Sequence, residues 1–358
     1  MLSTDDLKAL EVLHPCLHKR YSGVTTTILA VAPQMAKLAK TALVGLRWTA
    51  PGVPTISVKE VRSLGRSVPP TKPFRIWHAR RNDEMIVGLL LKKLLGMKLG
   101  MVFTSAAQRK HKKFSRWLMS KMDAIICPSP DAAAYLTFPS TVVFHGVDAE
   151  RYRPAEDRDA EWAATGLPGK YGIGVFGRIR AQKGTDLFIE SMCRLLPRYP
   201  DFTAVVIGLA TPQEKEWEAA LKKKVEDSGL GNRVVFLGEL PEHDVPGWFR
   251  KLTVFVGPQR NEGFGLTTLE AMASELAVVA TKAGAARHLI EEDVTGHLVE
   301  IEDVDTLTAR IENLMKDPQR AVRFGKAGRA RVLEKFAIQR EAEGIYKVYE
   351  QVWNTKKI

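Results

Sequence analysis

The sequence predicts an α/β protein built from two doubly wound domains with parallel sheets. The chain has 358 residues, which exceeds the usual size of a single domain. Short β-branched runs alternate with helical segments along its whole length, a pattern typical of parallel sheets covered by helices on both faces. These runs fall into two series, and the polar stretch between them has no strand of its own.

Twelve runs are expected to form strands. In the first series they are ALEVLH, TALVGL, FRIWHA, GMVFTS, AIICPS and TVVFHG, and in the second IGVFG, TAVVIG, RVVFLG, VFVGP, AVVAT and HLVEI. We therefore expect a first domain over residues 1–150, a linker over 151–170, a second domain over 171–335 and a closing helix over 336–358. The two domains are expected to face one another across a cleft at the carboxyl ends of their strands, with the closing helix packing back toward the first.

Composition favours a soluble globular protein of a reducing cytosol. The hydrophobic fraction is 45% and the mean hydropathy is −0.14. Three lysines interrupt the longest apolar region, MIVGLLLKKLLGMKLGMVF, which excludes an ordinary membrane span. The start, MLSTDDLKAL, has no apolar signal core, so we expect no export. Cys16, Cys127 and Cys193 lie far apart, which favours neither disulfides nor zinc.

The formal charge is unevenly distributed along the chain. Residues 1–150 hold 22 Lys and Arg against 10 Asp and Glu, whereas residues 151–358 hold 31 of each. The excess therefore lies in the first part and indicates an anionic partner for that part only. A solvated basic face is the alternative interpretation.

The stretch GVFGRIRAQKGTDLFI places a basic loop between a strand and a helix. The strand is expected to end at Gly177, and the helix to begin near Thr185, a good N-cap residue. Arg178 and Lys183 flank the turn between them and together suit a diphosphate, because arginine offers a planar fork of donors and lysine a mobile charge. Two solvated loop cations would give the same pattern.

The stretch RNEGFGLTTLEAM predicts an anion site with carboxylates on either side. A helix begins around Leu266, and its first N–H groups favour an anion such as phosphate. Gly263 and Gly265 allow close approach of the main chain. Glu262 lies just before this site and Glu270 about one turn into the helix, where simple helix-dipole stabilisation is the alternative. Phosphates flanked by hydroxyl-rich groups, as in a nucleotide diphosphate sugar, fit this mixture.

These motifs carry a family resemblance. EGFGLTTLEAM resembles the E-x7-E signature of retaining glycosyltransferases of family 4, which have the two-Rossmann GT-B architecture. GRIRAQKGTDLFIESM resembles that family's strand–Arg–loop–Lys–Gly segment, and VVFHGVDAERYRP resembles the segment that leads into its second domain. In this last segment the family commonly has Asn at the place of His145. The resemblance is specific over residues 141–300 and weaker over residues 1–140.

The resemblance implies roles for these residues. Arg178 and Lys183 would neutralise the diphosphate leaving group, Glu262 would bind hydroxyls of the donor sugar, and Glu270 would hold the ribose hydroxyls. Main-chain donor contacts would come from Gly177, Phe264, Gly265 and Leu266. The acceptor hydroxyl would attack from the side of the departing phosphate, so that catalysis rests on positioning and on stabilising developing negative charge.

The first domain is expected to hold the acceptor. Gly23 precedes an apparent helix start, another terminus that favours anions. His78, Arg80 and Arg81 follow or end the run FRIWHA, and a His at this place in the family commonly lies near the donor sugar. A His and an Arg pair that simply cap the strand end are the alternative.

The segment Gln108–Met122, QRKHKKFSRWLMSKM, combines cations with aromatic and apolar residues. As a helix it would suit an anionic membrane surface. It would equally suit an acidic acceptor, or pack as an ordinary helix with a wet basic face.

Two further patterns have ordinary explanations. Gly172, Gly174 and Gly177 spell GxGxxG, but they lie inside a strand, whereas a dinucleotide fingerprint follows one. Asp303 and Asp305 form D-x-D, yet they fit a helix start. We assign no metal and no cofactor.

The segments LHPCLHKRYSGVTTTI and WHARRNDEM are similar to segments of mannosyltransferases of Gram-negative lipopolysaccharide core assembly. This resemblance implies a retaining, metal-independent hexosyltransferase that moves mannose from GDP-mannose to an acidic lipid-linked acceptor. It would be cytoplasmic and peripheral on the inner face of the cytoplasmic membrane. The alternatives are a transferase for another envelope or exopolysaccharide that uses a UDP-hexose, a non-catalytic sugar-nucleotide sensor, and a basic nucleic-acid-binding protein without a visible recognition module.

Overall fold

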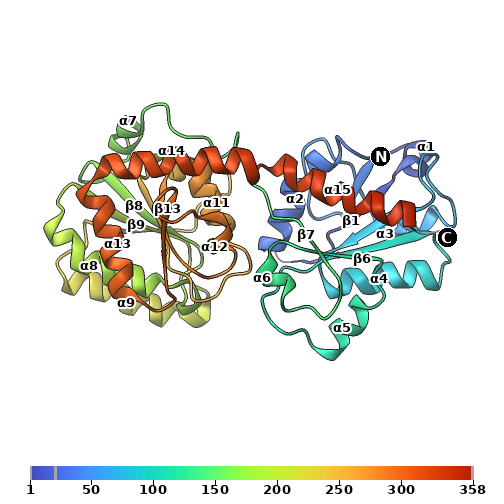
Figure 1. Cartoon of the computed structure of the whole chain (residues 1–358), viewed down its shortest axis with the longest axis horizontal. Coiled ribbons are helices and arrows are strands. Elements are labelled where there is room, and N and C mark those ends of the chain that lie inside the picture. The colour runs from blue at the N-terminus through green and yellow to red at the C-terminus, as the bar shows by residue number, and fades with distance from the viewer. Residues whose placement is uncertain (1, 20–21, 356–358) are drawn as a thin grey trace. The chain divides into compact units, whose positions relative to one another are not determined.

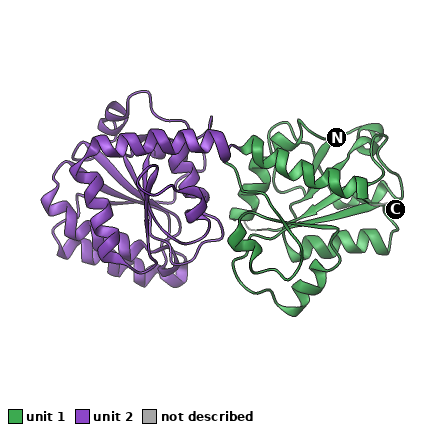
Figure 2. Ribbon diagram, in the orientation of Figure 1, with its two compact units in different colours: residues 1–146, 338–358 green, residues 147–337 purple. Residues whose placement is uncertain are grey.

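The computed structural model describes residues 2–19 and 22–355. Within them the chain forms two compact units, which Figure 2 colours separately. Unit 1 runs to Gly146 and resumes at Ile338, whereas unit 2 comprises residues 147–337. Each unit is built on one parallel sheet covered by helices (Figure 1), which confirms the predicted fold class. Among the described residues, no helix has the length and apolar character that crossing a membrane requires.

The strands of unit 1 pair in the order β3–β2–β1–β4–β5–β6–β7. They are β1 (Val12–Pro15), β2 (Thr41–Val44), β3 (Thr55–Ile56), β4 (Arg75–Ala79), β5 (Leu99–Thr104), β6 (Ala124–Cys127) and β7 (Thr141–Val142). The helices are α1 (Thr4–Ala9), α2 (Gly23–Met35), α3 (Val58–Ser63), α4 (Asn82–Lys93), α5 (Lys113–Met119), α6 (Pro130–Ala133) and α15 (Ile338–Thr355). All the predicted strands of the first series are present, and β3 was not predicted because two residues show no periodicity.

The strands of unit 2 pair in the order β10–β9–β8–β11–β12–β13. They are β8 (Tyr171–Phe176), β9 (Phe202–Ile207), β10 (Val234–Gly238), β11 (Val254–Gly257), β12 (Ala277–Thr281) and β13 (Gly296–Val299), as the second series predicts. The α-helices are α7 (Arg158–Ala163), α8 (Thr185–Leu195), α9 (Lys215–Asp227), α10 (Val245–Lys251), α11 (Leu266–Ala273), α12 (Ala286–Leu289), α13 (Val304–Lys316) and α14 (Pro318–Lys335). Short 3-10 turns are η1 (Ala181–Lys183), η2 (Leu196–Arg198) and η3 (Pro212–Glu214).

The last helix of the chain belongs to the core of unit 1. Its apolar face buries, among others, Ile345, Tyr349 and Trp353 against α2 and one face of the unit 1 sheet. The Trp353 indole N–H also donates to the carbonyl of Phe74, at 2.9 Å. Burying side chains of this size stabilises the folded state by about 1.5–3 kcal/mol each. The closing helix therefore packs onto the first unit, as predicted, and residues 356–358 lie outside the described chain.

A buried pair ties the beginning of α15 to the end of the first chain segment. Glu341 lies within hydrogen-bond distance of His145, with 2.8 Å between Oε1 and Nδ1, and its other oxygen accepts from the Gly146 N–H at 2.8 Å. Both side chains are buried. His145, which stands where the resembling family commonly has Asn, thus contacts the closing helix within unit 1.

The stretch predicted as a linker is part of unit 2. It contains α7, whose Trp162 is 2% exposed and donates its indole N–H to the Gly169 carbonyl at 3.1 Å. Arg158 reaches the carbonyl of Ser274 at 2.9 Å. The polar composition over residues 151–170 therefore corresponds to a folded segment with one apolar anchor, and the expectation of a linker is wrong.

The glycines of β8 are explained by packing. A side chain at Gly172 would overlap Trp162 and Leu252, and one at Gly174 would overlap Leu252. Both positions lie inside the strand, so these two glycines reflect close packing against Trp162 of α7 and Leu252, which lies two residues before β11. Packing therefore accounts for these two glycines, in line with the ordinary explanation expected for the pattern.

Candidate active site

Strands β8 and β11 are neighbours at the point where the strand order of unit 2 reverses. They pair in parallel, with Val254 opposite Ile173, and successive strands then continue outward on both sides. Loops that follow two such strands lie beside one another, which is the usual ligand position in open α/β sheets. Two hydrogen bonds join these loops: the Arg260 N–H donates to the Gln182 carbonyl at 2.9 Å, and the Gln182 amide donates to the Asn261 carbonyl at 3.1 Å.

Lys183 and Glu262 meet where these loops join. Their Nζ and Oε2 atoms are 2.5 Å apart, and each side chain is 21% exposed. The other Glu262 oxygen accepts the Gly263 N–H at 2.9 Å. The lysine stem lies over Gly177, since a Cβ there would be 3.7 Å from Lys183 Cε. The structure thus brings together one cation and one carboxylate that the sequence assigned to opposite ends of a ligand.

The backbone around Gly177 and Gly184 requires glycine. Gly177 has φ 132° and precedes Arg178, whose side chain is exposed. Gly184 has φ 70°, caps α8 in place of the expected Thr185, and would overlap the Pro258 carbonyl if it carried a Cβ. Any larger residue would be strained by the positive φ at either position, and at Gly184 it would also overlap the Pro258 carbonyl. The loop after β8 is therefore held directly against the chain that follows β11.

Helix α11 begins at Leu266, as the sequence predicts. Gly265, at φ 110°, is its N-cap and provides no side-chain cap, so the first-turn N–H groups face outward from the helix end. Phe264 is 4% exposed, and its carbonyl accepts from Ala285 at 2.8 Å. Main-chain donors and a helix terminus therefore lie directly after Glu262.

Glu270 lies in α11 within a polar group that the sequence did not reveal. Burial raises the pKa of its carboxyl to about 7, and repulsion by Glu242 adds to the rise. A hydrogen bond from the Tyr152 hydroxyl and the charge of Arg151 act in the opposite direction. Burial also raises the pKa of Tyr152, so this hydroxyl keeps its proton and remains the donor. Arg151 in turn pairs with Glu242 at 3.0 Å.

His78, expected near the donor sugar, lies inside unit 1 and is bonded to other residues of that unit. His78 is fully buried in unit 1, and its two ring nitrogens lie 2.5 Å from the Tyr349 hydroxyl and 2.7 Å from the Thr104 hydroxyl. Burial lowers its pKa well below the usual value, so the ring is neutral. His78 instead connects β4, β5 and α15, a contact at long sequence separation that no local pattern indicates.

The predicted acceptor residues occupy different environments in unit 1. Gly23 is exposed and begins α2. Arg81 is partly buried and donates to the hydroxyl of the preceding N-cap residue, Ser22, at 2.6 Å. Arg80 points inward, is 7% exposed, and lies 3.5 Å from the His14 ring. The structure therefore brings Gly23 and Arg81 together and leaves Arg80 little surface for a ligand.

Arg260, Arg151 and Tyr152 surround the predicted site without having been assigned to it. Arg260 lies two residues before Glu262, where the acidic signature begins, and this position was a usable signal. Arg151 and Tyr152 lie in the segment ERYRP, more than 100 residues from Glu270 in sequence, so their proximity follows only from the fold.

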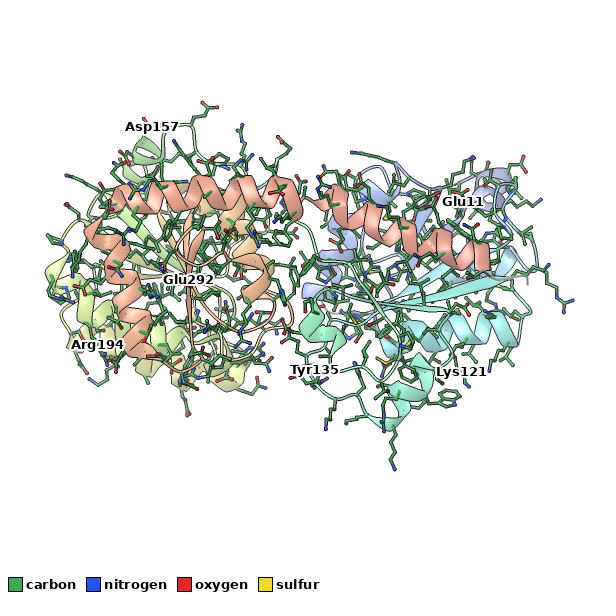
Figure 3. The ribbon with its side chains drawn as sticks, in the orientation of Figure 1. Glu11, Lys121, Tyr135, Asp157, Arg194 and Glu292 are labelled. Atoms are coloured by element: carbon green, nitrogen blue, oxygen red, sulfur yellow. The ribbon has the colours of Figure 1, made fainter. Side chains whose placement is uncertain are left out.

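The carboxylates with metal-binding geometry are already paired. Among the described residues, Glu292 (labelled in Figure 3), Asp293 and His297 offer ligand atoms within 4.8 Å of one another. Arg310 contacts Glu292 at 3.2 Å and Asp293 at 3.5 Å, so both carboxylates already have a cationic partner, and we assign no ion here. Asp303 caps α13 by accepting from the Thr306 N–H at 2.9 Å, which confirms its predicted place at a helix start.

Comparison with known proteins identifies relatives over the whole chain. The family model for glycosyl transferases group 1 matches residues 157–331. A lipopolysaccharide core biosynthesis mannosyltransferase, LpcC of Rhizobium leguminosarum bv. viciae, is 44% identical over 351 residues, covering 97% of this chain and 98% of that protein. The solved C-terminal domain of LpcC from Francisella tularensis is 42% identical and covers 54% of this chain and its own full length, with a TM-score of 0.53. HepE of Anabaena, solved with UDP and glucose, shares the fold, with a TM-score of 0.78 at 18% identity, over 96% of this chain and 100% of that chain.

We expect Tyr152→Phe to raise the pKa of Glu270 above about 7, because the variant lacks the hydroxyl that stabilises the carboxylate. Carbon-13 NMR of the glutamate carboxyl carbons during a pH titration measures this change. Tyr199→Phe is the matched control, since Tyr199 donates to Glu312 elsewhere in unit 2 at 2.7 Å. An unchanged Glu270 titration in Tyr152→Phe would contradict the assignment of this hydrogen bond.

The same pKa predicts a pH dependence of stability. The folded-state pKa of Glu270 lies above its ordinary value of 4.5, so its contribution is fully present below about pH 4.5 and is lost as the pH rises through about 7. Glu270→Gln should reduce this dependence in denaturant unfolding curves measured across that range. Parallel curves for variant and wild type would show that Glu270 is not the titrating group.

Proposed function

Because the chain belongs to the glycosyl transferases of group 1, we propose that it moves mannose from GDP-mannose to an acidic acceptor of the lipopolysaccharide core. The chain is a glycosyltransferase, and its near full-length identity of 44% to a lipopolysaccharide core mannosyltransferase supports this choice of donor and acceptor. The matched family consists of sugar transferases, so the nucleic-acid alternative is not carried further. A UDP-hexose remains the alternative donor.

The contact between Lys183 and Glu262 is the observation that carries the donor site. In the structure their charges neutralise each other, with Nζ and Oε2 2.5 Å apart. A bound diphosphate would offer Lys183 a stronger partner, since an ammonium group binds phosphate oxygens as a point charge. Glu262 would then be released to accept hydrogen bonds from the sugar hydroxyls. This one exchange of partners would place Lys183 on the diphosphate and Glu262 on the sugar of the donor.

The remaining groups extend this site along the donor. The first-turn N–H groups of α11 favour the phosphates, and exposed Arg178 adds a second cation. Glu270 would accept from the ribose hydroxyls, and the loop that carries Glu242 would lie near the base. These groups supply the positive charge that the leaving diphosphate needs, and we propose that the reaction requires no metal.

We propose that transfer retains the anomeric configuration. The bond between the anomeric carbon and the phosphate oxygen breaks while the acceptor oxygen bonds to that carbon on the same face. The acceptor hydroxyl proton passes to the departing phosphate, and Lys183 and Arg178 stabilise the negative charge that develops there. Glu262 orients the sugar and forms no covalent bond in this scheme.

The charge of unit 1 supports an acidic acceptor. The excess of Lys and Arg over Asp and Glu lies within residues 1–150. Arg81 and the exposed start of α2 at Gly23 provide positive potential near the carboxyl end of β4. An acceptor with phosphate or carboxylate groups matches this surface.

Helix α5 supports peripheral binding to the inner face of the cytoplasmic membrane. Phe114 and Trp117 are 56% and 52% exposed, and their rings stack with centroids 6.0 Å apart. Leu118 and Met119 are buried, so they fix α5 to the unit 1 core and leave the aromatic face outward. Lysines and arginines flank this face, and Lys121 follows it (Figure 3). Exposed aromatics among cations suit an anionic bilayer better than an ordinary packed helix.

A thermal-shift panel tests the donor. We expect GDP-mannose to raise the melting temperature more than UDP-glucose, UDP-galactose or ADP-glucose at the same concentration. A ligand at about 100 times its Kd stabilises the native state by about 2.7 kcal/mol, so the donor that binds most tightly gives the largest shift. The shift should be larger at about pH 8 than at about pH 6, since ribose hydroxyls need the ionised form of Glu270, whose pKa is about 7. A larger response to a UDP-hexose would replace mannose as the proposed sugar.

We expect Lys183→Ala to lower turnover by about 10²–10³, the usual effect of removing one preorganised donor at such a site. The release of GDP in the presence of a core oligosaccharide acceptor measures it. Lys223→Ala is the matched control, because Lys223 is an exposed lysine of unit 2 paired with Asp227 at 2.8 Å. Near wild-type turnover with an unchanged fold would remove Lys183 from the site.

Membrane binding is tested with vesicles that contain phosphatidylglycerol. The double variant Phe114→Ser with Trp117→Ser should lose most of the sedimentation with these vesicles, because the insertion of apolar area is removed while every cation stays. Leu333→Ser with Val294→Ser changes two exposed apolar residues of unit 2 and serves as the control. Equal binding by the aromatic double variant and wild type would contradict this surface.

A further inference from the structure

Arg260 uses all of its side-chain donors within the protein. Nη1 and Nη2 each bond one oxygen of Asp186 at 2.8 Å. Nε and Nη2 bond the two oxygens of Glu302 at 2.5 and 3.0 Å, and Nη1 also donates to the Ala181 carbonyl at 2.6 Å. A guanidinium has five N–H groups, and these five bonds account for all of them.

These bonds join three segments of unit 2. Ala181 begins the short turn that ends at Lys183, Asp186 lies in the first turn of α8, and Glu302 follows β13 with φ 70°. Arg260 itself lies two residues before Glu262, and its own N–H donates to the Gln182 carbonyl at 2.9 Å. Arg260 therefore bonds the turn that ends at Lys183 and lies in the same loop as Glu262, so it contacts the chain beside both residues of the pair.

The charges exclude a direct role in phosphate binding. Asp186 and Glu302 provide two negative charges for the one positive charge of Arg260, and the bonds to these carboxylates raise its pKa further above the ordinary arginine value. With every N–H engaged and its charge more than compensated, Arg260 has neither a free donor nor net positive potential to offer a diphosphate. Its contribution must therefore be made through the residues that it holds.

We infer that Arg260 is a positioning residue that holds the Lys183 turn and the Glu262 loop at a single separation suited to the donor. This inference rests on the proposed function, since it concerns the same site. A lysine cannot replace it, because one ammonium group cannot span Asp186, Glu302 and the Ala181 carbonyl together. Small displacements matter here, since misplacement of reacting groups by about 1 Å can cost about 10²-fold in rate.

The test compares Arg260→Lys with a structural arginine of the same unit. Arg233 donates to the carbonyls of Leu196 and Tyr199 at 2.9 and 2.6 Å and contacts neither loop of the site. We expect Arg260→Lys to weaken GDP-mannose binding about tenfold in calorimetry while the fold persists. Arg233→Ala should lower the melting temperature but leave the affinity of the folded protein within about twofold.

A double-mutant cycle shows whether Arg260 acts through Lys183. If it does, Arg260→Lys should cause little further loss of GDP-mannose affinity when Lys183 is already Ala, because the group being positioned is absent. Fully additive losses in the double variant, or unchanged affinity in Arg260→Lys, would overturn the inference.

Hydrogen exchange separates this outcome from a failure of the proposed function. Without any ligand, peptides covering residues 177–184 and 258–265 should exchange faster in Arg260→Lys than in wild type or Arg233→Ala. Unchanged protection of both loops would overturn the positioning role. Faster exchange combined with a wild type that binds no sugar nucleotide would instead overturn the proposed function and keep the structural link.

Discussion

The parallel pairing of β8 with β11 is the constraint on which the candidate site depends. It places the loops after these strands beside one another, although the loops are about 80 residues apart in sequence. One main-chain hydrogen bond and one bond from the Gln182 side-chain amide then join them. Gly184 permits the closest approach, because any side chain there would overlap Pro258. The meeting of Lys183 with Glu262 follows from this backbone geometry.

The charged side chains of the site form ion pairs with one another. Lys183 is neutralised by Glu262, Arg151 by Glu242, and Arg260 by its two carboxylates. In the proposed exchange, the negative charge of a diphosphate would replace the Glu262 carboxylate as the partner of Lys183. The balanced count of Lys and Arg against Asp and Glu over residues 151–358 agrees with this arrangement, and the basic excess of residues 1–150 fits a separate anionic partner.

The sequence predicts elements well where the chemistry is local. All twelve strands predicted from β-branched runs are present, and α11 and the Asp303 cap follow from glycine and N-cap signals. The errors have physical causes: β3 is two residues long, and the polar stretch before β8 hides the buried Trp162. Contacts between residues far apart in sequence could not be predicted from local patterns. Tyr152 beside Glu270, the five bonds of Arg260, and the burial of His78 under Tyr349 all depend on how distant segments meet.

A crystal structure of the chain with GDP-mannose would show whether Lys183 and Glu262 exchange partners when the donor binds. We expect the diphosphate at the carboxyl ends of β8 and β11, with Lys183 Nζ moved from Glu262 to a phosphate oxygen and the Glu262 carboxylate facing the sugar. A diphosphate bound elsewhere, with the Lys183–Glu262 pair intact at its present separation, would contradict this expectation.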